Sequence, residues 1–101
     1  MVKLNRIIFV EYRIAPELRE TYLSLVKRQL QSHTNAVLYE GTDQPNVFVE
    51  QWLNTSHEDY VRMKKLRLEE DSEWDEITAC IPGGRGKLHI WEFEELNKHC
   101  E

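Results

Sequence analysis

Residues 47–60 read VFVEQWLNTSHEDY and contain the passage from a strand into a helix. The first six residues are rich in β-branched and aromatic side chains, which is typical of a strand. Thr55 or Ser56 can cap the helix that follows, because an acidic residue stands three positions after each of them. Glu50 and Trp52 are two residues apart and therefore share one face of the strand. A carboxylate beside an indole on one face indicates either a functional site or part of the core.

Strand and helix patterns alternate on both sides of this stretch. Apolar residues recur at spacings of three and four after Pro16, which predicts an amphipathic helix. The residues Asp-Gln-Pro-Asn at 43–46 predict a turn, and hence a hairpin. We expect strands over 6–14, 36–42, 46–54 and 87–96, helices from 16 to 33–35 and over 56–70, and a shorter helix with Trp74, Ile77 and Ile81 on one face.

The order β-α-β-β-α-β over residues 1–101 predicts a single α+β domain of ferredoxin-like type. Its four-stranded antiparallel sheet would carry both helices on one face. Apolar residues nevertheless occupy both faces of the first, third and fourth strands, which is unusual for a sheet open to water on one side. For a chain of 101 residues, a second copy packed sheet to sheet is the simplest cover, so we expect a homodimer.

Composition excludes several classes of partner. The formal net charge is −5, which disfavours binding to nucleic acid or to an anionic membrane surface. The apolar run from Ile7 to Val10 is too short for a membrane span or a signal-peptide core. Two cysteines, Cys80 and Cys100, do not form a disulfide framework. We therefore expect a cytoplasmic protein.

The pattern resembles the dimeric α+β barrel superfamily, and within it the antibiotic biosynthesis monooxygenase-like proteins. The resemblance covers the order of elements along nearly the whole chain. Its sharpest part is the run Phe48-x-Glu50-x-Trp52, followed by a polar turn and a helix that opens with acidic residues and Tyr60. The resemblance implies the ferredoxin-like fold, the sheet-to-sheet dimer and chemistry on small molecules. It does not select one activity, because the superfamily includes cofactor-free oxygenases, haem-degrading enzymes and members without known activity.

The haem-degrading branch is the best-defined comparison. It uses an Asn late in the first strand, where this chain has Tyr12, and a Trp in the second helix, where this chain has Tyr60 or Val61. No histidine follows in that helix, and His57 stands at its entrance. The haem ligand is therefore missing where that branch places it, so a haem-binding or haem-degrading monooxygenase is the least favoured function, and we expect no cofactor.

Five residues are candidates for a catalytic site: Tyr12, Glu50, Trp52, Tyr60 and His89. Glu50 is suited to positioning or deprotonating a ligand, and a histidine among apolar neighbours is suited to act as a base. The favoured alternative is that Trp52 belongs to the core and that Glu50 pairs with a neighbouring Arg or Lys at the sheet edge or dimer interface.

Aromatic side chains suggest a cavity for a flat ligand between the sheet and the helices, with an ordinary core as the alternative. They are Tyr12, Tyr22, Tyr39, Tyr60, Trp74 and Trp91. The four histidines have no metal-binding spacing, and we expect no metal site. Residues 82–87, PGGRGK, lack the spacing of a phosphate loop and predict a flexible turn, whose Arg85 and Lys87 are available to an anionic ligand.

Two functions remain open from the sequence. The first is a cofactor-independent monooxygenase-like enzyme that acts on a small aromatic molecule. The second is a domain without catalytic activity that binds a small ligand or mediates assembly. A polar-lined pocket favours the first function, and a closed interior favours the second.

Overall fold

The computed structural model describes residues 5–69 and 71–96. Within them the order of elements is strand, helix, strand, strand, helix, strand, with short helices added before α1 and on both sides of residue 80. In chain order the elements are β1 (Arg6–Arg13), a 3-10 turn (Pro16–Leu18), α1 (Arg19–Leu30), β2 (Ala36–Glu40), β3 (Val47–Trp52), α2 (His57–Leu68), α3 (Asp75–Thr78), a second 3-10 turn (Gly84–Lys87) and β4 (His89–Glu94).

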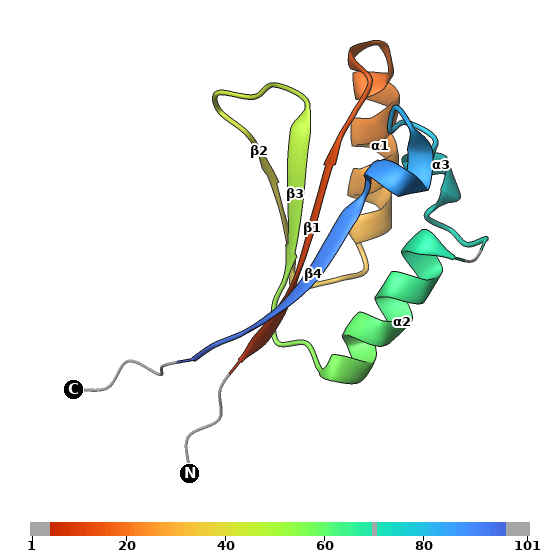
Figure 1. Ribbon diagram of the computed structural model, residues 1–101. Helices are drawn as coiled ribbons and strands as arrows, with labels where there is room; N and C mark the ends of the chain where they lie inside the picture. The colour runs from red at the N-terminus through yellow and green to blue at the C-terminus, as the bar shows by residue number, and fades with distance from the viewer. Residues whose placement is uncertain (1–4, 70, 97–101) are drawn as a thin grey trace.

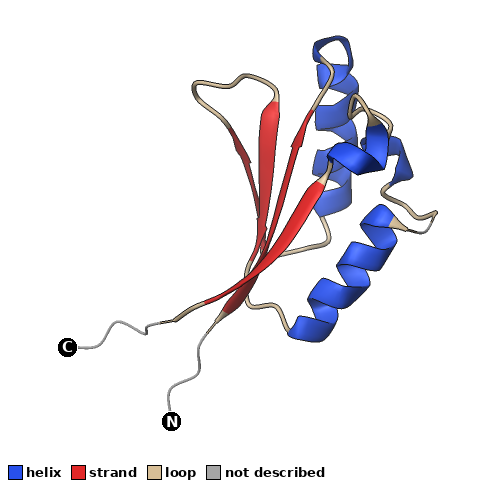
Figure 2. Cartoon of the chain, in the orientation of Figure 1, coloured by secondary structure: helices blue, strands red, loops and turns tan. Residues whose placement is uncertain are grey.

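The four strands form one antiparallel sheet in the order β2-β3-β1-β4. The helices all lie on one side of this sheet (Figure 1), and the other side carries strands alone (Figure 2). The predicted ferredoxin-like α+β fold is therefore confirmed. The register places Val10 of β1 opposite both Glu50 of β3 and Ile90 of β4.

The core lies between the sheet and the helices. Alternate residues of each central strand point into it, because successive side chains of a strand face opposite ways. Tyr22 and Val26 of α1 and Trp74, Ile77 and Ile81 around α3 close it from the helical side. The strand residues that it buries are Ile8, Val10, Tyr12, Phe48, Trp52 and Ile90.

The start of α2 follows from the sequence as predicted. The Ser56 hydroxyl accepts a hydrogen bond from the Asp59 amide at 3.1 Å, and the Asp59 carboxylate accepts one from the Ser56 amide at 2.9 Å. This reciprocal capping box satisfies two amides that the helix itself leaves without partners. Thr55 is not the cap; its hydroxyl donates to the Arg6 carbonyl oxygen at 3.1 Å.

The hairpin between β2 and β3 is held by one ion-paired cluster. Asn46 has a φ of 71°, in the left-handed region. Its amide donates to the Glu40 carboxylate at 2.9 Å, and Arg19 donates both to that carboxylate, at 2.5 and 2.8 Å, and to the Asn46 side-chain oxygen at 2.8 Å. The cluster joins the start of α1 to the hairpin.

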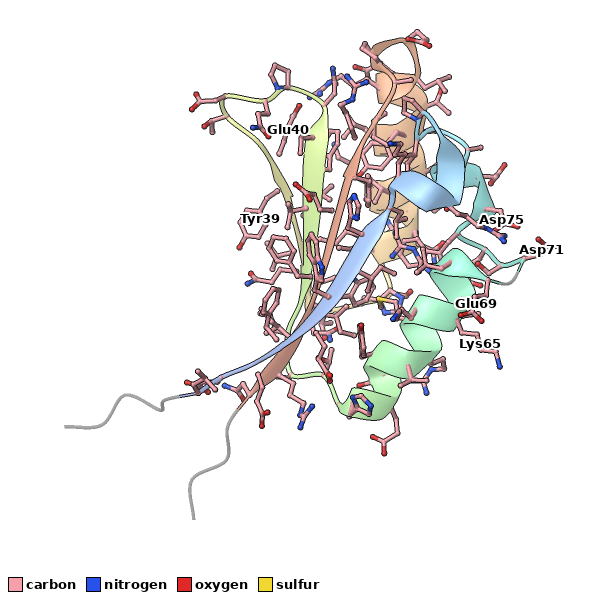
Figure 3. The ribbon with its side chains drawn as sticks, in the orientation of Figure 1. Tyr39, Glu40, Lys65, Glu69, Asp71 and Asp75 are labelled. Atoms are coloured by element: carbon pink, nitrogen blue, oxygen red, sulfur yellow. The ribbon has the colours of Figure 1, made fainter. Side chains whose placement is uncertain are left out.

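Two aromatic residues expected in the cavity lie elsewhere. Tyr39 and Trp91 are 50% and 42% exposed and occupy the face of the sheet that carries no helix. Figure 3 shows Tyr39 on the side away from α1 and α2. The physical reason is that successive side chains of a strand point to opposite faces of the sheet. Tyr39 pairs with Val49, and Trp91 pairs with Phe9. Val49 and Phe9 each stand next to an inward-facing residue, so both pairs point to the face without helices.

The segment after α3 has a regular backbone conformation, where the sequence predicted a flexible turn. Gly83 and Gly84 adopt φ values of 89° and 67°, and residues 84–87 then form a 3-10 turn. Arg85 forms ion pairs with Asp71 and Asp75 at 3.3 Å each, and Figure 3 labels both acidic residues.

No helix in the described residues is long and apolar enough to cross a membrane.

Candidate functional site

Three of the five candidate site residues meet on the helix-facing side of the sheet. Tyr12 lies on β1, and Glu50 and Trp52 lie on the adjacent strand β3. All three are buried, with exposed fractions of 2%, 0% and 3%. The strand pattern predicted that Glu50 and Trp52 share a face, and the structure confirms this.

Glu50 is paired with a basic side chain that comes from α2. Arg67 donates to the two carboxylate oxygens of Glu50 at 2.9 Å each, and neither side chain is exposed. A bidentate guanidinium–carboxylate pair is among the strongest charged hydrogen-bonding arrangements. We expected a basic partner at the sheet edge or dimer interface, whereas the pair lies inside the subunit.

Two further donors complete the surroundings of the carboxylate. The Tyr12 hydroxyl donates to Glu50 Oε2 at 2.5 Å, and the Trp52 indole donates to Oε1 at 2.9 Å. The Tyr12 hydroxyl also lies 2.7 Å from that of Tyr22. Four hydrogen bonds therefore reach one buried carboxylate, which is what a buried charge requires.

The surroundings of Glu50 keep it ionised. Burial alone would raise its pKa, but the charge of Arg67 and the hydrogen bonds from Arg67, Tyr12 and Trp52 together lower the pKa. Burial, followed by the charge of Glu50, raises the pKa of Tyr12 well above its usual value. The carboxylate is thus a weak base and the phenol a weak acid, so this geometry favours a structural role for the pair.

The ion pair also holds two tryptophans. The Arg67 guanidinium carbon lies 3.7 Å from the centre of the Trp74 ring, at cation–π distance, while Glu50 accepts from Trp52. Arg67 Nε is buried and has no hydrogen-bond partner among the described residues, so the indole face is its neighbour instead. The two indoles meet edge to face, with ring centres 6.1 Å apart.

A pocket opens directly beside these two indoles. Its volume is about 240 Å³. Its apolar lining comes from the sheet, from α2 and from the segment before α3: Ile8, Trp52, Met63, Leu66 and Trp74. Its polar lining consists of His33, Asn35, Thr55, Asp59, Arg62 and Glu73. The pocket thus combines apolar surface for a ligand body with polar side chains that could orient it, as a small-molecule site requires.

His33 is a pocket residue that the sequence pattern did not single out. It follows the end of α1, and its ring stands edge-on to Trp52 with centres 4.9 Å apart. Arg62 and Asp59, also at this pocket, are paired with each other at 2.7 Å. No sequence pattern indicates His33, because its position beside Trp52 depends on how the connection between α1 and β2 folds.

The remaining two candidates lie away from the pocket. Tyr60 is half-buried on α2, next to His57 and Lys64. His89 is exposed on β4, on the opposite face of the sheet from Glu50, and stacks on Trp91 with ring centres 5.6 Å apart. The five predicted residues therefore do not form one constellation.

The cysteine of the described residues, Cys80, does not line the pocket. Cys80 is buried, and burial raises the pKa of its thiol, as expected for an inert cysteine. Among the described residues no group of three or more His, Cys, Asp or Glu side chains is arranged to hold a metal ion.

The fold resembles those of solved structures, among them two that match over at least 92% of this chain. One is a conserved protein from Methanosarcina mazei Go1, with a TM-score of 0.64 at 11% identity over 92% of this chain and 94% of that chain. The other is a "putative Antibiotic biosynthesis monooxygenase" from Chloroflexus aurantiacus J-10-fl, with a TM-score of 0.54 at 16% identity over 95% of this chain and 97% of that chain. At these identities the likeness shows a shared fold. No protein-family model matches the chain, and no curated protein matches its sequence.

Proposed function

We propose that the chain binds a small aromatic molecule beside Trp52 and Trp74 and acts on it as a cofactor-independent, monooxygenase-like enzyme. The observation that carries this proposal is the pocket itself, which has two indoles in its apolar lining and a histidine edge-on to one of them. The fold it shares with the Chloroflexus protein supports the same class of chemistry by analogy.

The volume of the pocket limits the size of the ligand. An apolar cavity of about 150 Å³ accommodates benzene, so about 240 Å³ suits one aromatic ring or two fused rings. A porphyrin macrocycle exceeds this space, and α2 offers no histidine after its first residue, His57. The pocket therefore does not fit haem.

The chemistry follows from the groups at the pocket. A substrate with an acidic CH₂ group next to a carbonyl can lose a proton to the imidazole of His33, because imidazole is the side chain most often used as a general base. The substrate carbanion then reduces oxygen: the CH₂ group becomes a carbonyl, and the second oxygen atom leaves as water with the two hydrogens. In this scheme Glu50 accepts hydrogen bonds from Tyr12 and from Trp52 of the pocket wall, and neither Glu50 nor Tyr12 exchanges protons with the ligand.

The alternative function is binding without turnover. The buried Glu50–Arg67 pair favours it, because a carboxylate held by four hydrogen bonds leaves only polar groups at the rim of the pocket for chemistry. Both functions require a ligand to bind in the pocket. They differ in whether the protein then converts the bound ligand into a product.

The open face of the sheet supports a homodimer as part of the proposal. It exposes four large apolar side chains, Val37, Tyr39, Trp91 and Phe93, with exposed fractions of 37–50%. Phe9 packs against Trp91 and Phe93 with ring centres 5.8 and 5.9 Å apart. A second copy, sheet to sheet, would remove this apolar surface from water. Neither nucleic acid nor a membrane has a place in the proposed function, and its proposed location is the cytoplasm.

Oxygen uptake with 1,3-indandione tests the proposed activity. This flat molecule of two fused rings has an acidic CH₂ group, and its oxidation consumes one O₂ and yields 1,2,3-indantrione and water. We expect uptake to follow protein concentration and to match the trione formed. His33→Gln should lower kcat by 10²-fold or more, the usual contribution of a general base.

The matched control is His57→Gln, which removes an exposed histidine that pairs with Glu92 and does not line this pocket. Its rate should equal that of the wild type. Saturable binding of the dione without any uptake above the rate in buffer would favour the non-catalytic alternative. Equal losses in the two histidine variants would contradict a special role for His33.

A further inference from the structure

A second hollow lies toward the other end of β1 and has a different character. Its volume is about 550 Å³, within the usual range for small-ligand sites. The strands contribute Glu11, Tyr12, Arg13, Val47 and His89, and the surrounding loops contribute Gln44, Ile81, Pro82, Gly83 and Lys87. We propose that this hollow binds a small carboxylate with an apolar body. This proposal does not depend on the function of the pocket at Trp52.

Positive charge gathers in the hollow although the chain as a whole is acidic. Glu11 and His89 are direct partners across β1 and β4. Arg13, at the end of β1, and Lys87, in the 3-10 turn before β4, line the same hollow. Within the described part of the chain, neither Arg13 nor Lys87 forms an ion pair. Two cations face one acid, Glu11, so a carboxylate ligand would balance the charge of the hollow.

The loop before β4 is shaped so that Lys87 lies across it. A Cβ atom at Gly83 would stand 2.6 Å from Lys87 Cγ, and the φ of +89° at Gly83 further favours glycine. The stem of Lys87 therefore packs closely over the backbone of Gly83. This contact holds the lysine at the hollow and limits the rotamer freedom that ligand binding would otherwise have to remove.

The apolar part of the lining identifies the ligand more closely. Val47, Ile81 and Pro82 supply apolar surface beside the two cations. His89 is held against Trp91 by ring stacking, with an angle of 6° between the planes. A guanidinium suits a planar carboxylate, which it can bind through two hydrogen bonds. A carboxylate on a small apolar body therefore satisfies both parts of the lining, whereas inorganic phosphate satisfies only the charges.

The test is an NMR titration of the full chain with benzoate, using benzamide as the neutral counterpart of the same shape. We expect benzoate to shift the amide signals of Gly83, Gly84 and Lys87, and benzamide to bind at least tenfold more weakly. The double variant Arg13→Gln/Lys87→Gln should weaken benzoate binding by tenfold or more. Lys27→Gln, on the exposed side of α1, should leave it unchanged.

Three results would overturn the proposal. They are equal affinity for benzamide and benzoate, unchanged binding in the double variant, and affinity for inorganic phosphate as high as for benzoate. Benzoate shifts confined to Asn35, Leu66 and the Trp52 indole would likewise contradict it, because they would assign binding to the other pocket. The NMR signals that shift therefore distinguish binding in this hollow from binding in the pocket at Trp52.

Discussion

Glu50 and Arg67 are charged residues in the interior of a small domain, and each compensates the charge of the other. Removal of one member of such a pair leaves a buried charge without compensation, which costs more than the pair itself contributes. The same two side chains hold Trp52 and Trp74, so the stability of the fold and the shape of the pocket depend on one contact.

Glu50→Gln should therefore destabilise the protein by about 3–5 kcal/mol, because the guanidinium of Arg67 stays buried without a counter-charge. The measurement is the free energy of unfolding from urea denaturation. Glu94→Gln is the control, since the exposed Arg6–Glu94 pair at 3.6 Å should contribute at most about 1 kcal/mol. Losses of similar size in the two variants would show that the buried pair is not essential to the fold.

The carboxylate of Glu40 makes the free energy of unfolding depend on pH. The hydrogen bond from Arg19, followed by that from the Asn46 amide, lowers the pKa of Glu40 from its ordinary 4.5 to about 2. A pKa that is lower in the folded state means that the folded protein binds fewer protons, so the Glu40 contribution is complete above pH 4.5 and declines as the pH falls toward 2.

NMR titration of the Glu40 carboxyl measures this pKa directly. Arg19→Gln should move it back toward 4.5 and remove the corresponding acid sensitivity of the unfolding free energy. Arg28→Gln, an exposed residue on the same helix, is the control and should leave the pKa of Glu40 unchanged. A titration of wild-type Glu40 near its ordinary value would contradict the hairpin cluster.

At the scale of elements, the capping box makes the start of α2 the clearest test. Ser56→Ala removes the hydroxyl that accepts from the Asp59 amide and should cost about 1 kcal/mol of stability. Ser24→Ala is the matched control, because Ser24 is exposed within α1 and alanine is the better helix former. A loss in the Ser24 variant that equals the loss in the Ser56 variant would show that α2 begins without this cap.

Elements were predictable from the sequence where local rules decide them. The alternation in β1 and β3 and the cap at Ser56 act over a few residues, and each was recognised. The partner of Glu50 was not, because Arg67 is 17 residues away and the α2 pattern did not show which face of the helix contacts β3. His33 contacts Trp52 only in the folded chain. The contact could therefore not be predicted from the sequence alone.

At the scale of the whole molecule, the open sheet face predicts a dimer. Light scattering should give twice the chain mass of 12.1 kDa, and Trp91→Ser/Phe93→Ser should yield monomers, because the change removes two of the exposed aromatic side chains of that face. Val61→Ser is the control, since Val61 is 52% exposed on α2, on the helical side of the molecule. A monomeric wild type would contradict sheet-to-sheet assembly.

The most direct test of the account is the binding of 1,3-indandione followed by calorimetry, with Met63→Trp as the blocking variant. Met63 is half-buried and lines the pocket beside Trp52 and Trp74, so a larger indole fills the space that the ligand needs. The account predicts one saturable site per chain in the wild type and loss of that site in Met63→Trp, with Val61→Trp still binding. Equal binding by wild type and Met63→Trp would contradict the assignment of the ligand to this pocket.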